Sequence, residues 1–183
     1  MTKINKDYSE WLDVINDADI ASITLGELID STAKKYPDNE ALVYSNQPDV
    51  QDIRWTYKYL SESSTDLAKG FLDDGLLPGD TVGVWGPNHP EWILTEYALA
   101  KAGLKMVTLN PLYKEQELIF ALNTVNAKGL IHADEIGGLK ADELIEIIKP
   151  EITSLKNIHS FDAGLKKLIS SGKESLANLP SVN

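Results

Sequence analysis

The feature of the sequence that most limits the possible folds is a series of four short apolar runs that begins at residue 81. The runs are TVGVW at 81–85, KMVTL at 105–109, GLIHA at 129–133 and NIHSF at 157–161, with helix-length segments between them. Strands joined through helices need crossover connections, and these connections make the strands parallel. The right-handed crossover rule then predicts an α/β fold, a partial Rossmann-like αβα sandwich with a mainly parallel sheet.

A helix, a β-hairpin and a second helix are predicted ahead of this sheet. Thr24 and Glu27 have the spacing of a capping box, and Thr56 is placed to cap a helix that ends before Gly75. ALVY at 41–44 and IRWT at 53–56 are joined by the acidic, turn-rich segment SNQPDVQD, and together they predict a β-hairpin with a long loop. The predicted organisation is an N-terminal arm over 1–21, helix, hairpin and helix over 22–77, a parallel βα subdomain over 78–172, and a tail or truncated linker over 173–183.

The segments between the apolar runs carry helix start and stop signals. Pro90 suits a first helical turn and Gly103 a C-terminal cap, and Asn110 with Pro111 is expected to cap and begin the next helix. Apolar positions predicted to face inward in the last two helices are Leu139, Leu144, Ile147 and Ile148, followed by Leu165, Leu168 and Ile169.

Composition narrows the classes of partner. The net charge of −11 disfavours nucleic acid and anionic membrane surfaces, because both repel an acidic protein. No run approaches the roughly 20 apolar residues of a membrane span, and the acidic N-terminus resembles neither a secretory signal nor a transit peptide. The absence of cysteine excludes a thiolate metal site and a cysteine nucleophile. These features predict a cytoplasmic location.

Several sequence fragments occur together in a fixed order. They are Thr56-Tyr57 opening a helix, Gly79-Asp80 before a strand, Pro87-Asn88 followed by Glu91-Trp92, Lys101-Ala102-Gly103 at a helix end, and Asn110-Pro111-x-Tyr113 leading to Glu117-Leu118. In this order the chain resembles the N-terminal region of the adenylate-forming superfamily, from about Thr24 to Phe161. VGVWGPN and NPLYKEQEL are most similar to fatty acyl-CoA synthetases of the medium-chain type.

The resemblance implies the N-terminal subdomain of an acyl-CoA synthetase-like fold and a ligase reaction in the complete enzyme. Such enzymes activate a fatty acid with ATP and Mg²⁺ to an acyl-adenylate and then transfer the acyl group to CoA. Fatty acid and CoA would therefore be partners of the complete enzyme, and no cofactor is assigned to this chain.

The sequence lacks the parts that perform this reaction in the family. It contains no Ser/Thr/Gly-rich phosphate loop ending in Pro-Lys-Gly, no Tyr-Gly-x-Thr-Glu motif and no C-terminal domain with a catalytic lysine. SSGK at 170–173 is the nearest match to a phosphate loop, and we interpret it as a frayed helix end closed by Gly172. We therefore expect an N-terminal fragment that is inactive alone, with no catalytic, cofactor-binding or metal residue.

One loop is a candidate for a binding role. GVWGPNHP follows the first parallel strand, where open α/β sheets bind ligands, but its glycines do not form a dinucleotide-binding pattern. The loop is predicted to be a rigid turn, and its functional interpretation is a wall of the acyl or CoA tunnel formed by Asn88, His89, Trp92 and Asn110. His89, His132 and His159 follow or end three strands, but no short-spaced pair supports a zinc site.

Two other kinds of function stay open at this point. The chain could be a stand-alone module that binds a small molecule or nucleotide at the strand ends. It could also be an interaction partner of a full-length synthetase, because an incomplete layered core would expose an apolar face and favour association.

Overall fold

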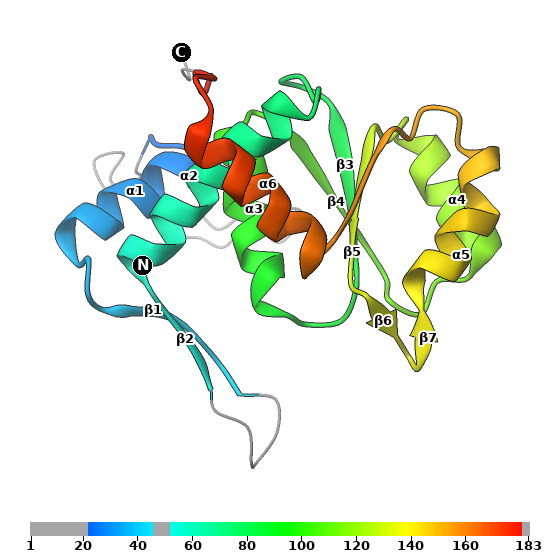
Figure 1. Ribbon diagram of the computed structural model, residues 1–183, viewed down its shortest axis with the longest axis horizontal. Helices are drawn as coiled ribbons and strands as arrows, with labels where there is room; N and C mark the ends of the chain where they lie inside the picture. The colour runs from blue at the N-terminus through cyan, green and yellow to red at the C-terminus, as the bar shows by residue number, and fades with distance from the viewer. Residues whose placement is uncertain (1–21, 46–51, 181–183) are drawn as a thin grey trace, which may run out of the picture.

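The computed structural model describes residues 22–45 and 52–180. At their centre is one parallel sheet with a layer of helices on each face (Figure 1). The sheet contains β3 (Thr81–Trp85), β4 (Lys105–Leu109), β5 (Gly129–His132) and β8 (Asn157–Ser160) in the order β4-β3-β5-β8. All three pairings are parallel. The predicted αβα sandwich is confirmed, while the predicted N-terminal arm lies outside the described residues.

Helices cover both faces of this sheet. In Figure 1, α2 (Tyr57–Asp73), α3 (Pro90–Lys101) and α6 (Ala163–Glu174) lie on one side, and α4 (Glu115–Thr124) and α5 (Ala141–Ile148) lie on the other. The two central strands are buried along nearly their whole length, which explains why they read as continuous apolar runs. The core includes Val82, Val84, Leu130 and Ile131 from these strands.

The elements ahead of the sheet follow their sequence signals. α1 (Leu25–Lys35) begins with the predicted capping box, in which Thr24 N–H donates to the Glu27 carboxylate at 2.8 Å and Glu27 N–H donates to Thr24 Oγ1 at 3.2 Å. The hydrogen bonds that the Thr24 N–H and the Thr24 hydroxyl donate to the Glu27 carboxylate lower the pKa of Glu27. β1 (Glu40–Tyr44) and β2 (Ile53–Thr56) pair antiparallel, and Thr56 caps α2 by accepting from Tyr59 N–H at 3.2 Å.

The region before α5 departs from the prediction. Leu139 was expected on the inner face of a helix, but it lies in β7 (Leu139–Lys140), which pairs with β6 (Glu135–Ile136). Gly137 and Gly138 both have positive φ and form the two-residue turn of this hairpin. The helix therefore begins at Ala141, and its buried residues are Ala141, Ile145 and Ile148. Leu139 and Ile147 are exposed, so these two inward assignments were wrong. A 3-10 turn, η2 (Lys149–Glu151), follows α5.

The SSGK residues at 170–173 belong to the last helix. α6 continues through these residues to Glu174, so the expected frayed end closed by Gly172 was wrong. Gly172 is buried against α2, where a Cβ atom would lie 1.8 Å from the Asp66 carbonyl oxygen. Gly70 of α2 has the reciprocal role, because its Cβ would lie 2.3 Å from the Leu168 carbonyl oxygen. The two glycines allow the backbones of α2 and α6 to approach closely.

A buried lysine joins the three N-terminal helices. The Lys101 side chain, only 3% exposed, extends from α3 and donates to Asp30 Oδ1 at 2.6 Å. It also donates to the Ser61 carbonyl oxygen and to Thr65 Oγ1, each at 2.8 Å. Burial lowers the pKa of Lys101, while the Asp30 carboxylate opposes this effect. Three acceptors satisfy all three ammonium protons, which makes burial of the charge tolerable.

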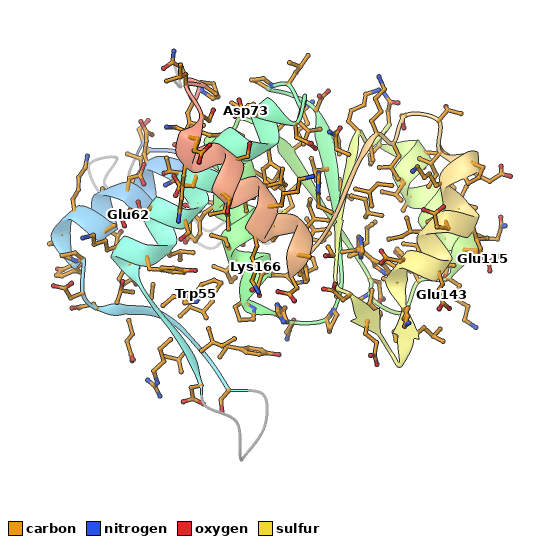
Figure 2. All side chains as sticks on the ribbon, viewed as in Figure 1. Trp55, Glu62, Asp73, Glu115, Glu143 and Lys166 are labelled. Carbon is orange, nitrogen blue, oxygen red and sulfur yellow. The ribbon has the colours of Figure 1, made fainter. Side chains whose placement is uncertain are left out.

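Charged side chains occupy the outer surface. Glu62, Asp73, Glu115 and Glu143 are exposed on α2, α4 and α5 (Figure 2). Within residues 22–45 and 52–180, no helix has the length and apolar character needed to cross a membrane.

Replacing Gly172 with alanine tests the contact between α2 and α6. Alanine normally stabilises a helix relative to glycine, but here its methyl group would collide with the Asp66 carbonyl. We expect the free energy of unfolding, measured by urea denaturation, to fall by about 2–3 kcal/mol. Ser171→Ala, at an exposed neighbouring position, is the control and should change it by less than about 0.5 kcal/mol. A neutral or stabilising Gly172→Ala would contradict the close helix packing.

The Lys101 network predicts an order of effects for its two charged partners. Asp30→Ala leaves a buried ammonium group without its carboxylate, so we expect a loss of about 2–4 kcal/mol in unfolding free energy. Lys101→Met should cost about 1–2 kcal/mol, because the Asp30 side chain is 43% exposed and water can solvate it. The double variant should be more stable than Asp30→Ala alone. The reverse order in urea denaturation would show that the ammonium group is solvated.

Candidate functional site

The loops that follow the parallel strands meet at one edge of the sheet. Residues 86–89 follow β3, residues 110–114 follow β4, and the β6–β7 hairpin follows β5. Because the carboxyl ends of parallel strands lie together, these segments from distant parts of the sequence become neighbours. This edge holds every residue that sequence analysis proposed for the acyl or CoA tunnel.

The loop after β3 is tightly packed at Gly86. A Cβ atom at Gly86 would lie 2.9 Å from the Ala133 Cβ and 3.0 Å from Phe161 Cε2, so this position has no room for a side chain. Pro90 is the first residue of α3, as expected. His89 is the N-cap residue of that helix, although its side chain does not cap the helix backbone.

Aromatic side chains hold His89 in place. Its imidazole ring stacks on Phe161, with centroids 5.6 Å apart and an interplanar angle of 16°. Tyr44 of β1 lies 5.8 Å from the same imidazole, and the Tyr44 hydroxyl donates to the Asn88 carbonyl oxygen at 3.3 Å. The Trp92 ring lies edge-on to the Phe161 ring, with ring centroids 6.5 Å apart. His89 also contacts the carboxylate of Glu91.

Asn88, His89 and Trp92 line one shallow pocket between β1 and the start of α3. Its volume is about 290 Å³, and Leu42, Val43, Tyr44, Pro90 and Ile93 complete the lining. The indole nitrogen of Trp92 and the hydroxyl of Thr95 are buried and have no hydrogen-bond partner within the described residues. The pocket offers apolar contact area and one aromatic cluster, and its lining includes neither lysine nor arginine.

Asn110 lies apart from these three residues. Its side-chain oxygen accepts from Leu112 N–H at 2.9 Å, and its carbonyl oxygen accepts from the indole N–H of Trp85 at 3.2 Å. The expected helix start at Asn110 and Pro111 was wrong, because α4 begins at Glu115 after a turn. Asn110 closes that turn with its own side chain, a role that asparagine fills often.

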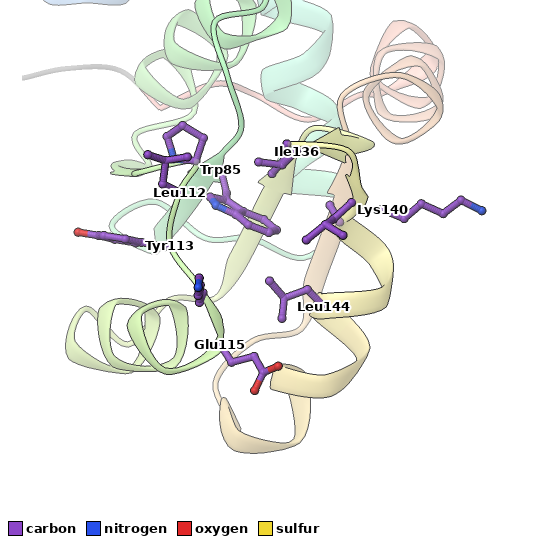
Figure 3. A pocket seen from close by; sticks show the side chains of 12 residues that line it. Trp85, Leu112, Tyr113, Glu115, Ile136, Lys140 and Leu144 are labelled. Carbon is purple, nitrogen blue, oxygen red and sulfur yellow. The ribbon is translucent and has the colours of Figure 1, made fainter.

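A second pocket, of about 360 Å³, is lined by Trp85 (Figure 3). Its walls come from the β4–α4 loop, the β6–β7 hairpin and the start of α5. The sequence did not predict this pocket, because Leu139 was assigned to the helix that carries Leu144. The pair Gly137-Gly138 between Ile136 and Leu139 was the available hairpin signal.

The three histidines do not form a common site. His132 is buried, with Nδ1 at 2.9 Å from the Ala133 carbonyl oxygen and Nε2 at 3.5 Å from Asp142. His159 binds the Asp74 carboxylate at 2.7 Å, on the side of the sheet covered by α2. No group of three His, Asp or Glu side chains in the described part of the chain is arranged to hold a metal ion.

Solved structures define the class of fold. A long-chain-fatty-acid-CoA ligase from Archaeoglobus fulgidus superimposes with a TM-score of 0.76 over 88% of this chain and 32% of that chain, at 24% identity. The N-terminal domain of FACL13 from Mycobacterium tuberculosis gives 0.71 over 87% of this chain and 37% of that chain, at 22% identity. The fold is thus that of the N-terminal domain of acyl-CoA ligases.

Sequence comparison identifies the family. The medium-chain acyl-CoA ligase ACSF2 of Mus musculus is 35% identical over 136 residues, which is 74% of this chain and 22% of that protein. The Bos taurus protein of the same name is 36% identical over 133 residues, 73% of this chain and 21% of its own length. The AMP-binding enzyme family matches residues 29–180, and the chain belongs to this family. It spans about a fifth of the length of these relatives.

Phe161 is expected to fix the loop that carries His89. Phe161→Ala removes a buried ring that stacks on His89 and contacts Trp92, so we expect the unfolding free energy to fall by about 3–4 kcal/mol. The His89 ring resonances should also shift in NMR spectra, because the stacked ring current is lost. Tyr44→Phe, which keeps the ring and removes only the hydroxyl, is the control and should cost under about 0.5 kcal/mol. Equal effects would show that the hydroxyl, and not the ring stack, fixes the loop.

Proposed function

We propose that this chain is the N-terminal part of an ATP-dependent fatty acyl-CoA synthetase and is inactive alone. The observation that supports this best is the family match over residues 29–180, combined with a sequence that contains no phosphate loop. The names of the two mammalian relatives describe acyl-CoA ligases, and the chain covers about a fifth of each.

In the proposed complete enzyme, a fatty acid carboxylate attacks the α-phosphate of ATP and releases pyrophosphate. The thiol of CoA then attacks the acyl-adenylate, which forms the thioester and releases AMP. Both steps build negative charge on phosphate and carbonyl oxygens, so catalysis requires fixed positive groups and N–H donors near those atoms.

The described residues do not fit a bound ATP and Mg²⁺. Pro87 and Pro90 remove two N–H donors from the loop after β3, and Ser170 to Lys173 lie within α6, where their backbone is hydrogen-bonded in the helix. The described part of the chain also contains no cluster of acidic or histidine side chains suited to a metal ion. ATP and Mg²⁺ would therefore depend on residues of the complete enzyme that this chain does not supply.

The role proposed for this chain within the enzyme is to form one wall of the acyl or CoA tunnel. Asn88, His89 and Trp92 line a common pocket at the carboxyl edge of the sheet, which supports this assignment for all three. Asn110 lies at the same edge of the sheet but outside this pocket, where its side-chain oxygen accepts from Leu112 N–H and stabilises the turn after β4. The cytoplasmic location stays a prediction; the names of the mammalian relatives place those proteins in mitochondria.

Pyrophosphate exchange tests whether the chain is inactive alone. The 183-residue chain, mixed with octanoate, ATP and Mg²⁺, should give no exchange above background, since it lacks a phosphate loop. Clear exchange would contradict the claim that the chain is inactive alone.

The reading frame after the codon for Asn183 provides the second half of the test. We expect it to encode a Ser/Thr/Gly-rich loop ending in Pro-Lys-Gly, and the extended protein should exchange pyrophosphate in the presence of a fatty acid. An extended protein without that loop, or a stop codon at that point, would contradict the synthetase assignment and favour a separate binding module or an interaction partner.

A further inference from the structure

Large apolar side chains are exposed on α4, on α5 and on the segments that precede these helices. The exposed fraction is 80% for Leu112, 73% for Phe120, 72% for Leu139 and 60% for Ile147. Single exposed apolar residues are common on any protein, but several that gather on one surface mark a contact with another molecule. The arrangement of these four side chains therefore decides whether they form a site.

Helix packing places Phe120 and Ile147 on the same surface. α4 and α5 lie beside each other in one helical layer (Figure 1). Asn123 Nδ2 of α4 donates to the Glu151 carbonyl oxygen of η2 at 3.0 Å, which ties the end of α4 to the turn after α5. Phe120 lies three residues before Asn123 and Ile147 lies four residues before Glu151. Each is therefore about one helical turn before this tie, on the side away from the sheet.

A pocket with an apolar base opens on the same surface, near the start of both helices. We define the Trp85 pocket by Trp85, Leu112, Ile136, Leu139 and Leu144. Figure 3 shows Trp85 between Leu112 on one side and Ile136 and Leu144 on the other. An apolar cavity of roughly 150 Å³ accommodates benzene, so this pocket of about 360 Å³ has room for an aromatic side chain of a partner. A hollow of about 350 Å³ beside Phe120 shares the lining residue Tyr113 with it, which makes the surface continuous.

The two helices carry charge of one sign. Neither α4 nor α5 contains lysine or arginine, and together they hold five exposed carboxylates, on Glu115, Glu117, Asp142, Glu143 and Glu146. Among the residues that the structure describes, none of the five forms an ion pair with lysine or arginine. Lys114 and Lys140 precede the helices, and the Lys140 ammonium extends outward from the pocket (Figure 3). A molecule that reaches the apolar side chains therefore meets carboxylates around them.

We infer that this surface docks a basic amphipathic helix of a partner protein. We call it the α4–α5 face and define it by the Trp85 pocket, Phe120, Ile147 and the five carboxylates. One apolar side chain of the partner helix occupies the Trp85 pocket, and others cover Phe120 and Ile147. Helix-in-groove binding uses apolar anchors of this spacing, and basic side chains that flank them pair with the carboxylates and set the orientation.

The size of the face sets the length of the helix. α4 has 10 residues and is therefore about 15 Å long. A partner helix of about 14 residues, about 21 Å long, reaches from the Trp85 pocket to beyond Phe120. Docking requires neither ATP nor a chemical step, and it does not use the pocket of Asn88, His89 and Trp92. The inference is thus independent of the proposed synthetase activity.

Titration of the 183-residue chain with a model peptide tests this assignment. The probe is a helical peptide of about 14 residues with leucine along one face and lysine elsewhere, and it is followed by fluorescence anisotropy. We expect a dissociation constant on the order of 10–100 µM, and a shift of the Trp85 indole N–H resonance in NMR spectra. A scrambled peptide of the same composition, and a peptide with glutamate in place of lysine, should each bind at least about tenfold more weakly.

Variants at exposed positions locate the apolar part of the face. Phe120→Ser removes a large apolar contact, so it should weaken binding of the basic peptide about tenfold. Leu176→Ser is the matched control, because Leu176 is 95% exposed and lies outside the α4–α5 face. Its affinity for the peptide should equal that of the unaltered chain.

A second pair of variants tests the charges. The double variant Glu115→Gln/Glu143→Gln removes two carboxylates of the face and should weaken binding about three- to tenfold. Its control is Glu62→Gln/Asp73→Asn, which removes two exposed carboxylates of α2 and changes the net charge equally (Figure 2). The control should change the affinity less than about twofold, since its positions lie on the other side of the sheet.

Three results would overturn the inference. Equal affinity for the amphipathic and the scrambled peptide would reduce the contact to unspecific attraction between charges, as would equal weakening by the two charge variants. A dimer of the 183-residue chain that Phe120→Ser dissociates would assign the face to a second copy. Loss of peptide binding in the extended protein, with the reading frame after Asn183 included, would assign it to the remainder of the same enzyme. None of these results bears on pyrophosphate exchange, so the two proposals fail independently.

Discussion

Burial of the central strand β3 on both faces is the constraint on which the rest of the structure depends. β3 pairs with β4 on one side and β5 on the other, and a Cβ atom at Gly83 would lie 2.8 Å from the Leu122 side chain of α4. A parallel strand buried in this way needs a helical layer on each face. The crossovers that supply those layers also bring the carboxyl ends of all four strands to one edge, where both pockets lie.

The two pockets show how one sheet edge produces sites of different character. Asn88 and His89, in the loop after β3, line a pocket with Trp92 of α3 and with residues of β1, and its walls combine aromatic and aliphatic side chains. The loop after β4 instead faces the β6–β7 hairpin, and its pocket combines an apolar base with lysines at the rim. Trp85, at the end of β3, lines only this second pocket, and its indole N–H donates to the Asn110 carbonyl oxygen in the loop after β4. The AMP-binding family assignment accounts for the fold of this edge and does not by itself assign a ligand to either pocket.

Local signals predicted the elements well, and they failed where a tertiary contact replaced a local one. Thr24, Thr56 and Pro90 occupy the predicted helix starts, since capping depends on atoms within one turn. Gly172 looked like a helix stop because a glycine often ends a helix, yet here α2 leaves no room for a side chain at that point. Lys101 looked like an ordinary basic residue at a helix end, and its burial among three helices depends on partners 36 to 71 positions away.

The sequence by itself determined the class of fold, the alternation of strands and helices that makes the sheet parallel, and the absence of a phosphate loop. Periodicity, caps and missing motifs are properties of contiguous residues, so they can be read without the structure. It also brought Asn88, His89 and Trp92 together correctly, since they lie within one loop and one helical turn. Only the tertiary structure separated Asn110 from them and created the Trp85 pocket. That pocket joins four segments whose relative positions are fixed by sheet order and helix packing, and no local pattern encodes such distances.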